Sequence, residues 1–277
     1  MPTTRRSLLA LSVLFVAPTN SSAIELWIGG DVQLGDHGPL DLGSLSPLLA
    51  GATGMVNLEG PVGETDERAL RLGNARSLLG SLRRAGIRAV GVANNHADDW
   101  GESGRTETLA ALREEGLVPI GGAARIHELV ISAHDLSEGV PSIDALTADV
   151  VTFHVTGPPS YLPRRELRQA VDHAVAAGAR VVAAHGTHAL GPVERRGDAV
   201  IAWGLGNLAF ACDCTDEIDG ALLRVSLAEE VRAWIVPIEA GLRGAAPRPA
   251  RDPALIFDLL DALGSTPLRR EGARAAF

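Results

Sequence analysis

Short, mainly apolar runs alternate with amphipathic segments along most of the chain. Apolar runs flanked by glycine or polar residues predict strands at 24–28, 55–58, 89–92, 117–120, 149–153, 180–184, 199–203, 221–227 and 232–238. Helical spacing predicts helices over 75–85, 104–115, 164–177 and 254–263, several of them followed by glycine. Such alternation is typical of an α/β domain, and we expect the last two strands to pair antiparallel.

The pattern predicts one domain, at residues 24–240. Residues 241–277 are expected to form a linker rich in glycine, alanine, proline and arginine, a C-terminal helix, and a loose tail after Gly264. With 277 residues, of which 46% are hydrophobic, the chain is long enough to bury one substantial core.

The first residues have the organisation of a secretory signal. Arg5 and Arg6 precede an apolar run at 8–17, and small residues follow up to Ala23, so we predict a signal peptide at 1–23 and an exported protein in the periplasm, envelope or medium. The run is shorter than the ~20 residues that span a bilayer. The paired arginines also fit a twin-arginine signal. An ordinary export signal and an amphipathic first helix remain as alternatives.

The charge balance excludes some partners. The formal net charge is −9, and −11 without Arg5 and Arg6, and all basic residues are arginine, so nucleic acid is not an expected partner. No later segment is apolar enough for a transmembrane anchor, and nothing indicates an oligomeric state. Binding a polyanionic polymer would require a local arginine patch, such as Arg164-Arg165 or Arg195-Arg196.

The chain has two cysteines, Cys212 and Cys214, which exclude a disulfide framework. They are compatible with a local bridge, a soft-metal site or two unrelated thiols.

Polar segments with metal-binding side chains follow several predicted strands. They are Gly30-Asp31-Val32, Asn57-Leu58-Glu59-Gly60, Asn94-Asn95-His96 and His185-Gly186-Thr187-His188. Because strand ends converge on one edge of an α/β sheet, these segments predict a metal-dependent hydrolase site.

A hydrolytic centre with two cations needs oxygen ligands and imidazoles that hold the ions roughly 4 Å apart. The candidate ligands are the carboxylates of Asp31 and Glu59, the amide of Asn95, and the imidazoles of His154, His185 and His188. His96, next to Asn95, is the candidate acid for the leaving group. The cations expected are two divalent ions, Mn, Fe or Zn. Asp31, Glu59 and the asparagines could instead cap turns, and the histidines at 37, 127, 134 and 173 are interpreted as surface or packing residues.

The same motifs resemble the CapA family of poly-γ-glutamate capsule biosynthesis proteins. The block from Asn94 to Gly101 and the block from Gly204 to Phe210 carry most of the resemblance, which covers residues 24–225. It implies a four-layer α/β/β/α sandwich of the calcineurin-like metallophosphoesterase type. It also implies metal ligation by the six candidate residues and a role for His96 at the transition state.

The chain departs from the related patterns at several positions. Gln33 stands where metallophosphoesterases have the histidine of Asp-x-His, and Val155-Thr156 follows His154 where the family has Trp-Gly. His185 and His188 are three residues apart, so the loop must bulge for both to face one ion. The stretch 125–144 is also short for the family.

We therefore expect an exported hydrolase of phosphoester type, acting on an envelope polymer or another phosphoester. Two other functions fit the sequence. One is a non-catalytic accessory protein of an envelope polymer machine, and the other is a nucleotide or cyclic-nucleotide phosphodiesterase.

Overall fold

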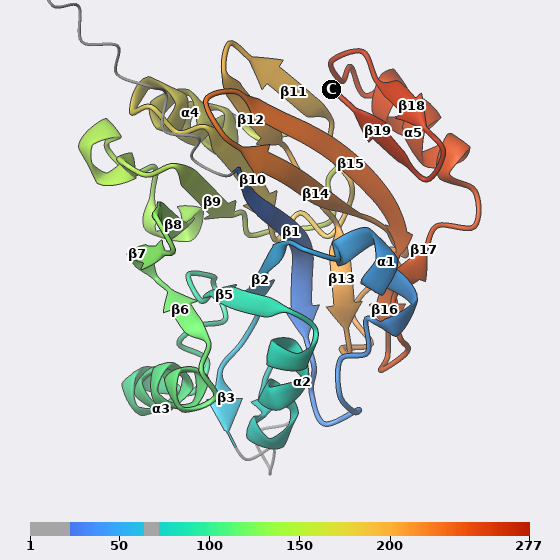
Figure 1. The fold of residues 1–277 in the computed structure, drawn as a ribbon. Coiled ribbons are helices and arrows are strands. Elements are labelled where there is room, and N and C mark those ends of the chain that lie inside the picture. Colours follow the sequence, from blue (N-terminus) through green and yellow to red (C-terminus); the bar gives the residue numbers. More distant parts are fainter. Residues whose placement is uncertain (1–22, 64–71) are drawn as a thin grey trace, which may run out of the picture.

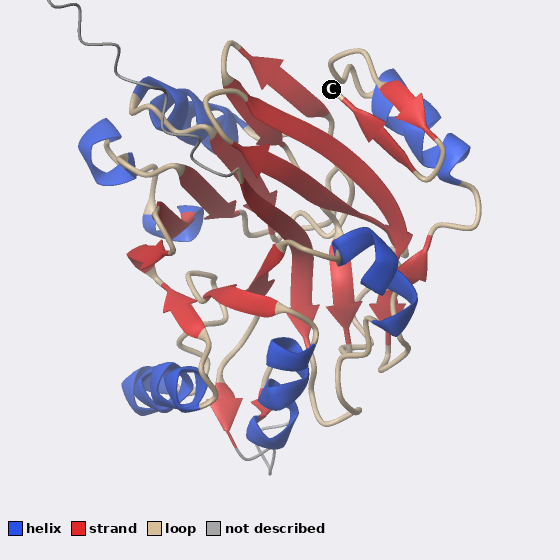
Figure 2. Cartoon of the chain, viewed as in Figure 1, coloured by secondary structure: helices blue, strands red, loops and turns tan. Residues whose placement is uncertain are grey.

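The computed structural model describes residues 23–63 and 72–277. The predicted signal peptide lies outside these residues, apart from Ala23. The two larger sheets and their flanking helices confirm the α/β class (Figures 1 and 2). No helix in the described part of the chain has the length and apolar content needed to cross a lipid bilayer.

The larger sheet has eleven strands, and its main path runs β18-β19-β15-β14-β1-β2-β5-β6. The strands on this path are β1 (Ile24–Gln33), β2 (Thr53–Leu58), β5 (Ile87–Gly91), β6 (Val118–Ile120), β14 (Asp219–Leu227), β15 (Val231–Glu239), β18 (Arg269–Glu271) and β19 (Arg274–Ala276). The short strands β13 (Asn207–Phe210), β16 (Gly241–Leu242) and β17 (Arg248–Pro249) join it beside the main path.

The smaller sheet has six strands in the order β11-β12-β10-β9-β8-β7. These strands are β7 (Gly122–Ile126), β8 (Leu129–Asp135), β9 (Val150–His154), β10 (Val181–His185), β11 (Val193–Arg196) and β12 (Ala199–Ala202). The strands β3 (Val62–Gly63) and β4 (Asn74–Ala75) form a separate pair.

Three buried clusters fix how these elements stack. One cluster joins facing side chains of the two sheets, such as Ile28 of β1 and Val181 of β10. The second packs the other face of the larger sheet against α1 (Ser46–Leu49), α2 (Leu79–Arg84) and α3 (Gly101–Glu114). The third packs the smaller sheet against α4 (Arg165–Ala176). The two sheets therefore lie face to face, with helices on their outer faces (Figure 1).

Four short 3-10 turns complete the secondary structure: η1 (Gly43–Leu45), η2 (Arg76–Leu78), η3 (Leu136–Glu138) and η4 (Ile143–Leu146).

The segment after Gly264 differs from its prediction as a loose tail. Strands β18 and β19 form a hairpin there, and β19 pairs antiparallel with β15. The preceding helix α5 (Pro253–Ala262) buries Ile256, Phe257 and Leu260 in the cluster between the sheets. The tail is ordered because it extends an existing sheet, which a local pattern does not reveal.

The stretch 125–144 also contains structure that the pattern did not predict. Strands β7 and β8 form an antiparallel hairpin, and β8 pairs parallel with β9. The β7 sequence, Gly-Ala-Ala-Arg-Ile, is partly exposed at the edge of its sheet and so lacks the apolar run that marks a buried strand. This hairpin brings Asp135 beside His154 of β9.

Candidate metal centre

Two rows of polar side chains face each other where parallel strands end. In the larger sheet, Asp31 of β1 is the register partner of both Asn57 on β2 and Asn207 on β13. In the smaller sheet, His154 of β9 is the partner of both Asp135 on β8 and His185 on β10. Since all four pairings are parallel, each row lies at one level of its sheet.

Asp31 links the two rows. Its fully buried carboxylate accepts a hydrogen bond from Asn57 Nδ2 at 2.9 Å and another from the backbone N–H of Gly186 at 2.8 Å. Gly186 has φ +72°, and a Cβ there would lie 2.5 Å from His154 Nε2. Only glycine therefore allows this loop to approach both Asp31 and His154.

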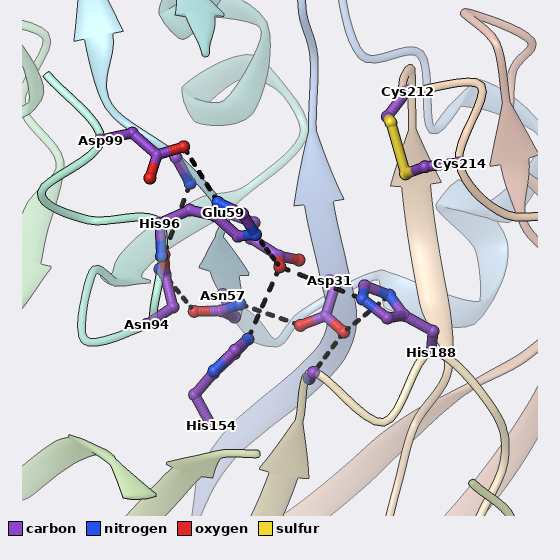
Figure 3. A network of polar contacts seen from close by, with 12 residues as sticks. Asp31, Asn57, Glu59, Asn94, His96, Asp99, His154, His188, Cys212 and Cys214 are labelled. Carbon is purple, nitrogen blue, oxygen red and sulfur yellow. Dashed lines mark hydrogen bonds and ion pairs between the residues drawn. A yellow bond between two sulfur atoms is a disulfide. The ribbon is translucent and has the colours of Figure 1, made fainter. Parts of the chain in front are cut away.

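Glu59 stands at the middle of the imidazoles (Figure 3). It follows β2, is 2% exposed, and its backbone N–H donates to the carbonyl of Val32 at 2.8 Å. Its Oε1 lies 3.6 Å from Nε2 of His154, 3.9 Å from Nε2 of His96 and 4.0 Å from Nε2 of His188. Its Oε2 is buried and has no hydrogen-bond partner among the described residues.

The loop that carries His188 turns through two left-handed residues. His188 has φ +50°, an uncommon conformation for a side chain of this size, and Gly186 has φ +72°. His188 Nδ1 lies 2.9 Å from Oδ1 of Asn207. Because that oxygen can only accept, Nδ1 donates to it, and Nε2 faces Glu59. The predicted bulge between His185 and His188 is thus present.

His154 and His185 are buried beside carboxylates. His154 Nδ1 lies 3.7 Å from Asp135 Oδ1, beyond hydrogen-bond distance, and His185 Nδ1 lies 3.6 Å from Asp31 Oδ1. Both nitrogens of each ring lack a hydrogen-bond partner within the described part of the chain. Buried imidazole nitrogens without partners are unusual in a native structure, and a bound cation would satisfy one nitrogen of each ring.

Burial and the neighbouring charges set the protonation states. Burial lowers the pKa of His154, but the carboxylates of Asp135 and Glu59 outweigh it and raise the pKa to about 9. Burial lowers the pKa of His185 to about 4, despite the charge of Asp31. Burial raises the pKa of Glu59, yet His154 and the other histidines hold it below its ordinary value. A cation must therefore displace a proton from His154, whereas His185 is already neutral.

His96 lies at the mouth of the site, in the loop between β5 and α3. Its Nδ1 is 2.9 Å from Oδ2 of Asp99, and its side chain is 31% exposed. Asn94 fixes this loop because its Nδ2 donates to the carbonyl of Leu58 at 2.9 Å and its Oδ1 accepts from the N–H of His96 at 3.2 Å.

The structure brings together five of the six predicted ligands, namely Asp31, Glu59, His154, His185 and His188. The sixth, Asn95, lines an adjacent cavity, and the amides in the network are those of Asn57, Asn94 and Asn207. Asn94 was not among the candidate ligands. Asn57 precedes Glu59 by two residues, and side chains two apart along a strand point to the same face. This spacing could have placed Asn57 in the site. Nothing local to Asp99 or Asp135 indicated their roles.

The donor set fits a divalent cation. Asp31, Glu59 and His188 each offer one ligand atom, and these atoms lie within 4.8 Å of one another. Carboxylate oxygens combined with imidazole nitrogens suit Mn, Fe and Zn. Two further imidazoles lie beside this group, with His154 Nε2 3.6 Å from Glu59 Oε1 and His185 Nδ1 3.6 Å from Asp31 Oδ1.

Gln33, at the position of the missing histidine, has a structural role. Its Nε2 donates to the carbonyl of Gly73 at 2.7 Å, and its Oε1 accepts from the N–H of Cys212 at 2.8 Å. Cys212 and Cys214 form a disulfide next to this contact, which decides between the three interpretations of the cysteine pair (Figure 3).

The fold and site define an α/β protein with a buried cluster of carboxylates and histidines at the ends of parallel strands. The family model described as bacterial capsule synthesis protein PGA_cap matches residues 41–130 and 131–212. The chain belongs to this family, as its motifs predicted. A comparison with curated proteins finds no match.

Two solved structures resemble the chain weakly. A hypothetical protein from Thermus thermophilus is 15% identical, with 81% of this chain and 96% of that chain covered and a TM-score of 0.45. Vps29 from Chaetomium thermophilum is 11% identical, with 77% and 88% covered and a TM-score of 0.39.

Proposed function

We propose that this capsule synthesis family member is an exported metal-dependent hydrolase of phosphoester type that acts on an envelope polymer. One observation carries the proposal: Glu59 Oε1 lies within 4.0 Å of the Nε2 atoms of three histidines, next to a buried Asp31. Among the described residues, Glu59 Oε2 and both ring nitrogens of His154 and His185 are buried without hydrogen-bond partners, which costs stability unless a cation completes the group.

Asp31, Glu59, His154, His185 and His188 would hold the metal, and Asn95 remains a predicted ligand. The proposed occupancy is two divalent cations, Mn, Fe or Zn. Bound there, they would supply an activated water and neutralise charge on the substrate's oxygens. The protein's part is to fix the donor atoms in a buried site, through the hydrogen bonds from Asn57 and Gly186 to Asp31 and the contact between Asn207 and His188.

His96 is the residue proposed to protonate the leaving group. Its Nδ1 is held by Asp99 at 2.9 Å, so Nε2 is free to donate a proton to the departing oxygen. Its partial exposure lets a substrate reach it, whereas the other histidines near Glu59 are more buried. Protonation there prevents the departing oxygen from leaving as a high-energy alkoxide.

Export and the polymer substrate are proposed on separate grounds. The predicted signal peptide at 1–23 and the disulfide between Cys212 and Cys214 both fit an oxidising compartment outside the cytoplasm. The link with a capsule polymer comes from the family to which the chain belongs.

A second candidate is a non-catalytic accessory protein with one structural cation. The compact group of Asp31, Glu59 and His188 favours it, because three ligands within 4.8 Å suffice for a single ion. Gln33 favours it too, since its side chain is occupied in contacts with Gly73 and Cys212.

Hydrolysis of bis(p-nitrophenyl) phosphate separates the two candidates. The chelator-treated protein is reloaded with Mn²⁺ or Zn²⁺ and compared with a His96→Asn variant reloaded in parallel. The hydrolase proposal expects metal-dependent turnover that falls in the variant although metal content is unchanged. Full metal loading without turnover of any phosphoester would favour the accessory candidate.

A further inference from the structure

The carboxylate of Glu59 depends on the backbone for its position. Its Oε1 lies 3.6 Å from Nε2 of His154, beyond hydrogen-bond distance, and its Oε2 has no hydrogen-bond partner among the described residues. The carboxylate of Asp31 differs, because Asn57 and the backbone of Gly186 donate to its two oxygens. Whatever fixes the turn that carries Glu59 therefore also fixes this candidate ligand.

The side chain of Asn74 contacts this turn through three successive carbonyl groups. Its Nδ2 donates to the carbonyl of Glu59 at 2.9 Å and to that of Gly60 at 3.1 Å, and it lies 3.3 Å from the carbonyl oxygen of Pro61. The backbone N–H of Asn74 donates to the same Pro61 carbonyl at 2.8 Å. Because three consecutive carbonyls converge on one amide, Asn74 sets the direction in which the chain leaves β2.

The other end of the Asn74 amide is tied to the end of β1. Its Oδ1 accepts a hydrogen bond from the backbone N–H of Leu34 at 2.7 Å. Next to it, the backbone N–H of Ala75 donates to the carbonyl of Gly35 at 2.8 Å. Leu34 follows directly after β1, which carries Asp31. One amide thus joins the ends of the two strands that lead to Asp31 and Glu59.

Asn74 is itself fixed in place. It is fully buried, and it is the register partner of Val62 in the parallel pair of β3 and β4. The carbonyl of the preceding residue, Gly73, accepts from Gln33 Nε2 at 2.7 Å. Gly73 also packs against Trp100, since a Cβ there would lie 2.5 Å from that ring. Asn74 can therefore hold the turn without moving with it.

The role requires an amide. The side chain must accept from Leu34 and donate to the carbonyls at 59–61, and asparagine is the short uncharged residue that does both. An ionised aspartate has nearly the same shape and can still accept, but it cannot donate. It would leave the buried carbonyls without their partner and place a negative charge against them.

We propose that Asn74 is a positioning residue for metal binding, because its amide holds the turn of Glu59 against the end of β1 and so places the Glu59 carboxylate opposite Asp31. The inference rests on the proposed metal-dependent function and adds a residue outside the predicted ligand set. Each hydrogen bond of the Asn74 side chain goes to a backbone group, so Asn74 acts on the cation through Glu59.

The test compares Asn74→Asp with Ser81→Ala by calorimetric titration of the chelator-treated protein with Zn²⁺. Ser81 is the matched control, because it is also buried and its hydroxyl accepts from the N–H of Leu40 at 2.9 Å and donates to the carbonyl of Leu78, outside the site. The absorption spectrum of the Co²⁺-loaded protein reports the ligand geometry independently of stability. If Asn74→Asp does not fold, the uncharged Asn74→Ser takes its place with the same expected result.

Asn74→Asp should weaken Zn²⁺ binding by about 10–100-fold and change the Co²⁺ spectrum, as loss of an outer partner of a ligand does, whereas Ser81→Ala should do neither. The loss caused by Asn74→Asp should shrink in a Glu59→Gln background, because Asn74 acts through Glu59. Unchanged affinity in Asn74→Asp, an equal loss in Ser81→Ala, or an undiminished loss in the Glu59→Gln background would overturn the proposal.

Two results separate this proposal from the proposed function. If the unmodified protein binds Zn²⁺ and the variants behave as expected, but no phosphoester is hydrolysed, the hydrolase function fails and the role of Asn74 stands. If the unmodified protein binds no Zn²⁺, both proposals fail.

Discussion

Asp135 and His154 are register partners on adjacent parallel strands, and Asp135 Oδ1 lies 3.7 Å from His154 Nδ1. The carboxylate is itself held, because Ser137 donates to its two oxygens from the backbone N–H at 2.9 Å and from the hydroxyl at 2.6 Å. His154 Nε2 points the other way, toward Glu59 at 3.6 Å. Asp135 therefore lies on the side of the ring opposite Glu59, where an outer-sphere carboxylate orients a metal-ligating histidine, at a separation longer than a hydrogen bond.

Replacing Asp135 by asparagine should weaken metal binding. Loss of such an outer carboxylate costs about 10–100-fold in metal affinity, because the imidazole loses both its orientation and part of its basicity. Calorimetric titration of the chelator-treated protein with Zn²⁺ measures the effect. Asp144→Asn, at an exposed position, is the matched control. Equal affinities for the two variants would show that Asp135 does not orient His154.

Gly186→Ala should destabilise the protein. Its new Cβ would lie 2.5 Å from His154 Nε2 in a residue with φ +72°, and left-handed strain alone costs on the order of 1–3 kcal/mol. Denaturant unfolding measures the free energy of unfolding. Gly197→Ala is the control. Gly197 also has a positive φ, +59°, but no described atom lies within 4 Å of an added Cβ, so this variant measures the backbone strain without the clash. We expect the larger loss at Gly186, and equal losses would mean that the loop relaxes freely.

The metal-free protein should be most stable near pH 6.5, the ordinary pKa of histidine. The His154 pKa of about 9 exceeds its unfolded value, so the folded state binds more protons and loses stability as pH rises toward 9. The His185 pKa of about 4 is below its unfolded value, so the unfolded state binds more protons and stability falls as pH drops toward 4. The free energy of unfolding, measured across pH with a chelator present, should show both limbs.

Two variants assign the limbs of that pH profile. His154→Gln should flatten the alkaline limb and His185→Gln the acidic limb, since each removes one titrating group. If the free energy of unfolding of metal-free His154→Gln still falls as pH rises toward 9, the alkaline limb does not come from His154.

Asp99→Asn should lower turnover without lowering metal content. The asparagine cannot stabilise protonated His96 as the carboxylate does at 2.9 Å, and loss of positioned acid catalysis costs about 10²–10⁴-fold in rate. Steady-state hydrolysis of an alkyl phosphodiester, whose poor leaving group needs protonation, tests this. A leaving group of lower pKa needs less protonation, so the variant should lose less rate on it. Equal losses on good and poor leaving groups would argue against an acid role for His96.

The local sequence predicted much of the fold because periodicity and glycine caps are local signals. Helices α3, α4 and α5 lie close to the predicted ranges, and β1 begins at the predicted Ile24. The hairpin of β7 and β8 was missed because an exposed edge strand carries little apolar pattern. The order at β18 and β19 comes from pairing with β15, over a separation that no local pattern reports.

The site was predictable in its residue types more than in its geometry. Asp31, Glu59 and the three strand-end histidines are recognisable by their chemistry and position. Asp135 is not, because its role depends on its register with His154 across a strand pair that was not predicted. The choice between Asn94 and Asn95 depends on how one loop turns, and residue type alone does not decide it.

The decisive measurement is the metal content of the purified protein after reloading with Mn²⁺, Fe²⁺ or Zn²⁺, compared with Asp31→Ala and His188→Ala. If this cluster binds a cation, the unmodified protein should contain at least one equivalent of metal per chain, and both variants should contain clearly less. Less than one equivalent of every metal, or contents unchanged by the two substitutions, would contradict the assignment of this cluster as a metal centre.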